Sequence, residues 1–202
     1  MLRARRAVLV SGGGTNLQAL LDAQKSGVIT SGEIRLVVSS KPGVYALERA
    51  RCAGVRAVVV QRSGRTAADF EGELIRLLEQ EKIDLIVLAG FMCILSADFT
   101  GMYKDRIINV HPSLIPSFCG EGFYGLKVHE AALEYGVKVT GATVHFVNEI
   151  PDGGRIIAQK AVEIHQGDTP ELLQQRVMRE AEWIILPQAV QKVSEAITCK
   201  GA

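Results

Sequence analysis

Apolar residues form short runs that alternate with amphipathic segments over the first half of the chain. Five runs are predicted as buried strands, because each is a nearly continuous apolar stretch that ends at glycine or at polar residues. The runs are "AVLV", "EIRLVV", "VRAVVV", "IDLIVL" and "DRIINVH". Helices are predicted over 15–27, 44–54 and 66–80, the last with Phe70 and Leu74 on one apolar face. This alternation predicts right-handed crossovers and a parallel sheet covered on both faces.

The second half of the chain follows a different pattern. A helix is predicted over 126–136, then an alternating segment, "VKVTGATVHFVNE", typical of an antiparallel strand, then a further strand, "GRIIAQKAVEI". The last element is a long C-terminal helix that begins with Thr169 as N-cap and Pro170 at its first position, and we expect Pro187 to kink or break it. The predicted fold class is α/β: an open, mostly parallel Rossmann-like sheet with helices on both faces and an antiparallel strand near the C-terminal part.

Composition and charge exclude several classes of protein. The chain has 202 residues, 48% of them hydrophobic, and a net charge of +1, which gives no electrostatic case for binding nucleic acid or a membrane surface. No stretch reaches the ~18 apolar residues of a membrane span, and the first apolar run is too short for a signal sequence. We therefore expect a soluble, cytoplasmic protein. The four cysteines are far apart and form no C-x-x-C pair, so neither a metal site nor a disulfide framework is expected.

A glycine-rich segment, "SGGGTN" at 11–16, lies between the first strand and the first helix. Backbone amides at a helix N-terminus bind anions, and glycines let a ligand approach closely. The dinucleotide fingerprint does not match, because Leu17 stands at its third glycine and the second strand ends in Ser39, Ser40 and Lys41 instead of an acid. The segment fits a phosphate monoester better, and a tight turn without a ligand is an equally weighted alternative.

The segment "INVHPSLIPSF" at 108–118 is the strongest candidate for chemistry. Asn109 and His111 share one side of a strand, at the carboxyl edge where open parallel sheets bind ligands. An amide and a protonated imidazole both donate hydrogen bonds, so together they suit an oxygen on which negative charge develops. The alternative is a histidine that only caps a loop.

Other polar or apolar segments are weaker signals on their own. "NEIPDGG" at 148–154 contains Asp152 but fits an ordinary hairpin turn, and "GFMCIL" at 90–95 is either a wall of the site or plain core. His145 faces either the cleft or a core partner, while His129 and His165 are expected to be structural or solvated.

Five segments, in order between about Ala7 and Pro187, resemble the phosphoribosylglycinamide formyltransferases of the 10-formyltetrahydrofolate-dependent formyltransferase family. They are "VLVSGGGTNLQALLDA", "VLAGFMCIL", "INVHPSLIPSF", "GATVHFVNEIPDGG" and "IIAQKAVEIHQGDT". The resemblance implies transfer of a formyl group from 10-formyltetrahydrofolate to the primary amine of glycinamide ribonucleotide, in purine biosynthesis. Asn109 and protonated His111 would stabilise the tetrahedral intermediate. Asp152 would raise the pKa of His111, so that activity is lost on the alkaline side, and would order a water that carries the proton.

The resemblance also implies binding residues. Gly14, Thr15 and Asn16 would bind the ribonucleotide phosphate, and Glu182 its ribose. The folate would contact Met92, Cys93, Ile94, Leu95, Asn109, Asn148, Glu149, Ile150, Pro151 and Asp152, with Arg65 as a further contact and no metal ion. Three features depart from the family pattern: Cys93 stands where many relatives have arginine, the loop at 118–126 is longer, and Trp183 replaces a histidine.

The resemblance leaves alternatives within and outside the family. Methionyl-tRNA formyltransferase and formyltetrahydrofolate hydrolase carry additional domains for which 202 residues leave no room. The hydrolase and a non-catalytic nucleotide-binding module remain the alternative functions. We expect one formyltransferase domain over 1–202, with a nucleotide- or phosphate-binding half at about 1–100 and a catalytic and folate-binding half at about 101–202. We expect two small-molecule substrates, no nucleic acid or membrane partner, and a monomer or homodimer.

Overall fold

The computed structural model describes residues 3–200. Its strands are β1 (Ala4–Val10), β2 (Gly32–Ser39), β3 (Arg56–Val59), β4 (Leu85–Leu88), β5 (Ile107–His111), β6 (Val139–Phe146) and β7 (Ile156–Glu163). Its helices are α1 (Thr15–Lys25), α2 (Tyr45–Cys52), α3 (Ala67–Gln80), α4 (Ala97–Met102), α5 (Leu126–Tyr135), α6 (Pro170–Val177) and α7 (Trp183–Lys200), with a π-helical turn η1 (Met178–Glu182) between the last two.

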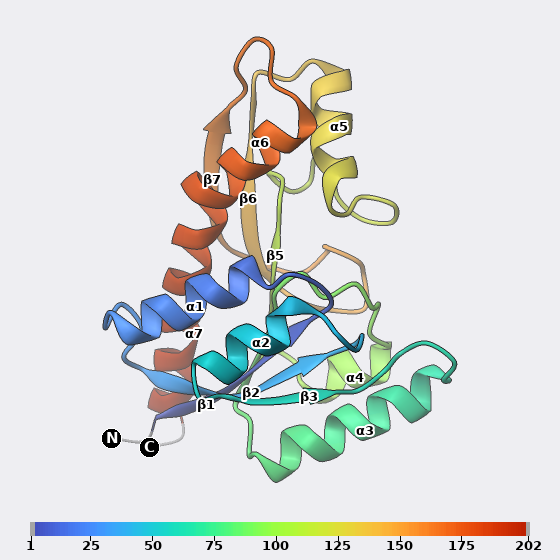
Figure 1. Ribbon diagram of the computed structural model, residues 1–202, viewed down its shortest axis with the longest axis vertical. Coiled ribbons are helices and arrows are strands. Elements are labelled where there is room, and N and C mark those ends of the chain that lie inside the picture. The colour runs from blue at the N-terminus through green and yellow to red at the C-terminus, as the bar shows by residue number, and fades with distance from the viewer. Residues whose placement is uncertain (1–2, 201–202) are drawn as a thin grey trace.

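The strands form one seven-stranded sheet in the order β3-β2-β1-β4-β5-β6-β7 (Figure 1). The first five strands run parallel, and β6 and β7 join antiparallel at one edge. The predicted fold class is therefore confirmed. The strand order reverses between β1 and β4, which is where open α/β sheets bind ligands beyond their carboxyl ends.

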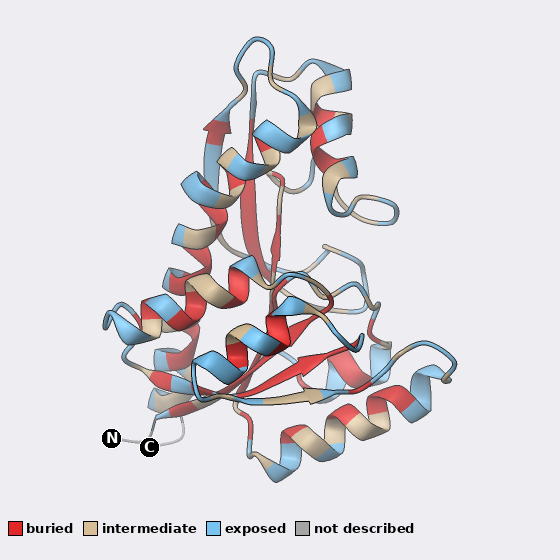
Figure 2. Ribbon diagram, in the orientation of Figure 1, coloured by how far each residue is buried: buried red, intermediate tan, exposed pale blue. Residues whose placement is uncertain are grey.

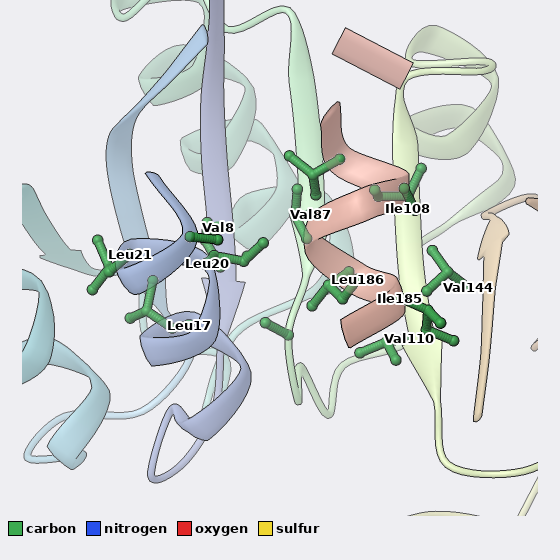
Figure 3. Packing of buried hydrophobic residues seen from close by; sticks show 14 of the residues in the cluster. Val8, Leu17, Leu20, Leu21, Val87, Ile108, Val110, Val144, Ile185 and Leu186 are labelled. Atoms are coloured by element: carbon green, nitrogen blue, oxygen red, sulfur yellow. The ribbon is translucent and has the colours of Figure 1, made fainter. Parts of the chain in front are cut away.

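Helices cover both faces of the sheet, and each face has its own apolar cluster. On one face, residues of β1, β4, β5 and β6 pack against α1 and α7; Figure 3 shows Val8, Val87 and Ile108 close to Leu20 and Leu186. On the other face, alternate residues of the same parallel strands pack against α3 and α4. Figure 2 shows the central strands buried along most of their length, as expected for parallel strands between two helical layers.

Helix α4 was not predicted. It has only six residues, and its clearest signal is Ser96, whose side chain accepts a hydrogen bond from the backbone N–H of Phe99 as an N-cap. A helix this short does not repeat its apolar spacing often enough for the pattern to stand out.

The predicted long C-terminal helix is present, but the expected break at Pro187 is wrong. The helical run is interrupted earlier, at the π-helical turn η1, and α7 continues through Pro187. Pro187 is the fifth residue of α7, about one turn after η1, so the residue without a backbone N–H follows a stretch in which the regular α-helical hydrogen-bond pattern is already interrupted. Glu182 lies in η1, so the interruption falls on a predicted site residue.

Within residues 3–200, no helix combines the length and the apolar character that a bilayer span requires.

Candidate active site

Strand β5 carries the predicted amide and imidazole to the carboxyl edge of the sheet. Its alternate residues Ile108 and Val110 point into the core on the α1/α7 face, which leaves Asn109 and His111 on the opposite side. His111 is the last residue of the strand and only 4% exposed. Pro112 follows and cannot extend the hydrogen-bonded ladder, so the chain turns away from the sheet at this point.

Asp152 lies beside both groups, although it is 41 residues beyond His111 by numbering. Its Oδ2 is 3.4 Å from Nδ1 of His111, and its Oδ1 is 3.4 Å from Nδ2 of Asn109. The backbone N–H of Gly120 donates to Oδ2 at 2.9 Å. Asp152 adopts a left-handed backbone conformation, with φ of 56°, which is uncommon for a non-glycine residue. The structure thus brings the three predicted catalytic side chains into one cluster.

A fourth side chain, His145 on β6, completes this cluster. It pairs with Asn109 across the antiparallel β5–β6 ladder, and its Nε2 is 3.3 Å from Nδ2 of Asn109 and 3.5 Å from Oδ1 of Asp152. Its Nδ1 is 2.8 Å from the carbonyl oxygen of Phe146, which can only accept, so Nδ1 carries a proton. Sequence reasoning left His145 unassigned, because alternation alone does not show which side of the strand faces the cleft.

Burial and nearby charge act on the pKa of His111 in opposite directions. Burial lowers the pKa of His111 below its ordinary value, and the Asp152 carboxylate and the Phe118 carbonyl only partly offset it. The expected raised pKa is therefore wrong for the free protein, and the resting imidazole is mainly neutral near pH 7. Burial also acts to raise the pKa of Asp152, but contacts with His145, His111 and the Gly120 N–H outweigh it, so that carboxyl remains ionised.

The cluster forms one wall of an open cleft. The predicted folate residues that line it are Cys93, Ile94, Leu95, Asn109, Asn148, Glu149, Ile150, Pro151 and Asp152, together with Leu88, Phe91, His145 and Val147. Met92 does not line the cleft; its backbone N–H donates to Oγ of Ser11 at 2.9 Å. Arg65 lies outside too, with Nη1 2.5 Å from Oε2 of Glu73 on α3.

The glycine-rich segment turns the chain from β1 into α1. Gly14 is the N-cap of α1 with φ of 74°, and a Cβ there would lie 2.6 Å from Cβ of Ala46, so only glycine fits this close approach of α2. A Cβ on Gly12 or Gly13 would meet no atom within 4 Å, so this part of the loop is open. The N-cap makes no side-chain hydrogen bond, which leaves first-turn N–H groups for an anion.

Asn16 and Glu182 meet beneath this loop. Nδ2 of Asn16 donates to Oε2 of Glu182 at 2.5 Å, and both side chains are buried. Burial raises the pKa of Glu182 to about 7, with the Asn16 hydrogen bond opposing it. The amide oxygen of Asn16 has no hydrogen-bond partner among the described residues. The predicted phosphate and ribose residues are therefore neighbours.

His129 on α5 is fully buried, contrary to a solvated role. Neither ring nitrogen has a hydrogen-bond partner among residues 3–200. Burial, with a smaller contribution from the charge of His111, lowers the pKa of His129 to about 4. It is therefore a neutral, buried imidazole at physiological pH. No group of three or more His, Cys, Asp or Glu residues in the described part of the chain is arranged to hold a metal ion.

An open α/β sheet with a glycine-rich loop and a buried amide–imidazole–carboxylate cluster at its carboxyl edge is the framework of an α/β enzyme. A family described as "Formyl transferase" matches residues 4–190. The chain belongs to this family, and the resemblance inferred from the sequence is confirmed.

Solved structures of similar sequence share the fold over almost the whole chain. Glycinamide ribonucleotide transformylase 1 from Symbiobacterium toebii is 41% identical, with a TM-score of 0.89 over 96% of this chain and 89% of that one. Phosphoribosylglycinamide formyltransferase from Brucella melitensis is 39% identical, with a TM-score of 0.86 over 96% of each chain.

Curated relatives are longer proteins. The human trifunctional purine biosynthetic protein adenosine-3 is 44% identical over 200 residues, which are 98% of this chain but 19% of that protein. The chloroplastic phosphoribosylglycinamide formyltransferase of Arabidopsis thaliana is 39% identical over 88% of this chain and 61% of its own length. The chain thus spans only part of the curated relatives that it matches.

Proposed function

We propose that the chain transfers a formyl group from 10-formyltetrahydrofolate to the primary amine of glycinamide ribonucleotide. The observation that carries this proposal is the meeting of Asn109, His111 and Asp152 at one end of a cleft, next to an open glycine-rich loop. The family membership and the names of the similar solved structures support the same reaction. No metal ion takes part in it.

In the proposed reaction, the amine attacks the formyl carbon and forms a tetrahedral intermediate with an oxyanion. Asn109 donates its amide N–H to this oxygen. The neutral His111 ring takes up the proton released by the attacking amine, directly or through a water held by Asp152. The resulting imidazolium then donates to the oxyanion in exchange for its contact with the Phe118 carbonyl. On collapse, the proton goes to the departing nitrogen of tetrahydrofolate. The two acceptors already beside the ring, Asp152 and the Phe118 carbonyl, favour this charged form once negative charge develops.

The two substrates approach from different segments of one domain. The phosphate would bind the open backbone around Gly14, Thr15 and Asn16, and Glu182 would accept hydrogen bonds from the ribose hydroxyls. The formylfolate would occupy the cleft between 91–95 and 147–152, with its formyl group toward Asn109. Met92 and Arg65 would contact it only if their surroundings rearranged, since neither lines the cleft.

The test is a folate absorbance assay started by addition of glycinamide ribonucleotide. We expect release of tetrahydrofolate that depends on the acceptor, and its loss by at least a hundredfold in His111→Ala. His165→Ala is the matched control, because His165 is an exposed histidine outside the cluster. Release without the acceptor would favour the hydrolase alternative. Binding without turnover would favour a non-catalytic nucleotide-binding module.

The pH dependence of kcat/KM tests the proton role of His111. Because the pKa of His111 is lowered, we expect the acid limb of kcat/KM to lie below the ordinary histidine value, since only there is the free ring protonated and unable to take the proton of the amine. If kcat/KM instead fell at alkaline pH, and this fall were absent in His111→Asn, the His111 imidazole would have to be charged in the free protein.

A cytoplasmic location and a monomeric or homodimeric state complete the proposal. The Arabidopsis relative is named a chloroplastic protein, so cell fractionation is the test of location, and light scattering is the test of assembly.

A further inference from the structure

Helix α2 holds two consecutive carbonyl groups of the glycine-rich loop. The carbonyl oxygen of Gly12 accepts a hydrogen bond from the backbone N–H of Ala46 at 3.3 Å. The carbonyl oxygen of Gly13 accepts from a side chain, since Nε of Arg49 donates to it at 2.9 Å. Figure 1 shows α2 beside α1, so the loop that leads into α1 is held from the side by its neighbour. Both carbonyls therefore point toward α2.

These two contacts set the direction of the amide groups that follow. In a trans peptide, the C=O of one residue and the N–H of the next point in opposite directions. With the carbonyls of Gly12 and Gly13 turned toward α2, the N–H groups of Gly13 and Gly14 point away from it. Neither N–H group has a backbone acceptor among residues 3–200. Both are therefore available to an anion at the N-terminus of α1.

The peptide between Gly13 and Gly14 depends on such a contact more than an ordinary peptide would. Glycine reaches backbone conformations that are closed to other residues, so a peptide with glycine on both sides can flip. After a flip, the carbonyl oxygen would stand where the N–H had been, and it would repel a phosphate. Arg49 opposes the flip, because the flip would break its hydrogen bond to the Gly13 carbonyl.

The guanidinium of Arg49 is itself fixed in place. Its Nη1 donates to Oε1 of Gln18 on α1 at 2.9 Å, and its Cζ lies 4.8 Å from the centroid of the Tyr45 ring. A Cβ on Gly14 would lie 3.5 Å from Cδ of Arg49, so the stem of the side chain packs against the loop. None of the ion pairs found in the described part of the chain includes Arg49. Its polar contacts are with the loop and with α1.

A further group at the same loop lacks a partner that a ligand could supply. The amide oxygen of Asn16 belongs to a buried side chain and accepts no hydrogen bond from the described residues. It is an acceptor, whereas the N–H groups of Gly13 and Gly14 are donors. A phosphorylated ribose meets both needs, since its phosphate oxygens accept hydrogen bonds and its hydroxyls donate them.

We infer that Arg49 is a positioning residue for the phosphate of the ribonucleotide: it holds the Gly13 carbonyl so that the N–H of Gly14 faces the phosphate. The inference rests on the proposed function, which assigns this phosphate to the loop. Arg49 acts through the peptide and does not itself touch the phosphate. Its replacement weakens binding of the acceptor and leaves the chemistry at His111 unchanged.

The test compares glycinamide ribonucleotide with glycinamide ribonucleoside, the same acceptor without its phosphate. In Arg49→Gln we expect KM for the ribonucleotide to rise about three- to tenfold, the loss of roughly one net hydrogen bond. kcat, KM for 10-formyltetrahydrofolate and kcat/KM for the ribonucleoside stay unchanged. Arg49→Lys should show a similar rise, because an ammonium does not reproduce the planar donation to Gly13 and Gln18. Arg51→Gln is the matched control, since Arg51 is an exposed arginine on the same helix.

A titration with inorganic phosphate tests the same contact without turnover. Phosphate that binds the folded chain raises its Tm, and the dependence of Tm on phosphate concentration gives the dissociation constant. We expect Arg49→Gln to bind phosphate about three- to tenfold more weakly than the unaltered chain, and Arg51→Gln to match the unaltered chain.

Each other result has a distinct meaning. An equal loss for ribonucleotide and ribonucleoside, or full affinity in Arg49→Gln, would overturn the positioning role. Full affinity in Arg49→Lys would show that positive charge alone suffices and would overturn it as well. If the unaltered chain formylates neither acceptor but binds inorganic phosphate more tightly than Arg49→Gln does, the proposed function fails while the role of Arg49 in phosphate binding stands.

Discussion

Replacing the buried His129 tests how strongly the interior opposes a charged imidazole. Its pKa of about 4 lies below the ordinary value of 6.5, because burial disfavours the charged ring and neither nitrogen has a partner among the described residues. Between these two pH values the unfolded chain binds a proton that the folded chain does not, so stability falls as pH falls. The whole difference corresponds to about 3 kcal/mol, of which about 2 kcal/mol is lost between pH 7 and pH 5.

The assay is urea denaturation of the unaltered chain and of His129→Leu, each at pH 7 and at pH 5. Leucine is apolar and favours helices, so it suits a buried position on α5. We expect the unaltered chain to lose about 2 kcal/mol more free energy of unfolding than the variant between the two pH values. Comparing the two losses cancels the change in packing and the contribution of Glu182, which both proteins contain. The smaller charge interaction between His111 and His129 is lost with the ring and is part of the measured difference. An equal loss in both proteins would refute the reasoning, and His165→Leu, at an exposed site, should behave like the unaltered chain.

Three further predictions concern the site. Asn109→Ala should lower kcat about 100- to 1,000-fold in the formyl-transfer assay by removing one donor to the oxyanion, and a loss below tenfold would argue against that role. Gly14→Ala should cost about 1–3 kcal/mol in urea denaturation, because its Cβ would meet Ala46 at a φ of 74°, whereas Gly13→Ala, with open space, should cost less. Glu182→Gln should lose less stability than the unaltered chain between pH 5 and pH 8. In the folded chain Glu182 has a pKa of about 7 and stays protonated at pH values where the unfolded carboxyl, with a pKa of about 4.5, ionises. The folded state therefore loses up to about 3 kcal/mol of stability as the pH rises, and glutamine, which does not ionise, avoids this loss. Equal losses of unfolding free energy in the variant and the unaltered chain would contradict the raised pKa.

The parallel part of the fold could be predicted because strands buried on both faces must be apolar throughout. The runs ending at Val10 and Leu88 stand out for this reason, and both are fully flanked by helices in the structure. Helix α4 and the π-helical turn η1 could not be predicted, since a few residues do not establish a helical period and a π turn depends on what packs around it.

The site could be predicted where local geometry determines it. Asn109 and His111 share a side because side chains alternate along a strand, and glycine at position 14 fits a left-handed turn. The participation of His145 depends on the register of β5 with β6, which the sequence does not specify. The lowered pKa of His111 depends on how completely the fold buries it, so the sequence indicated only the opposing effect of Asp152.

The most direct measurement of the central claim is the mass of glycinamide ribonucleotide after incubation with the chain and 10-formyltetrahydrofolate. If Asn109, His111 and Asp152 carry formyl transfer, the nucleotide gains the mass of one formyl group, and Asp152→Asn slows this gain sharply. An unmodified nucleotide, or equal formylation by the unaltered chain and by Asp152→Asn, would contradict the account.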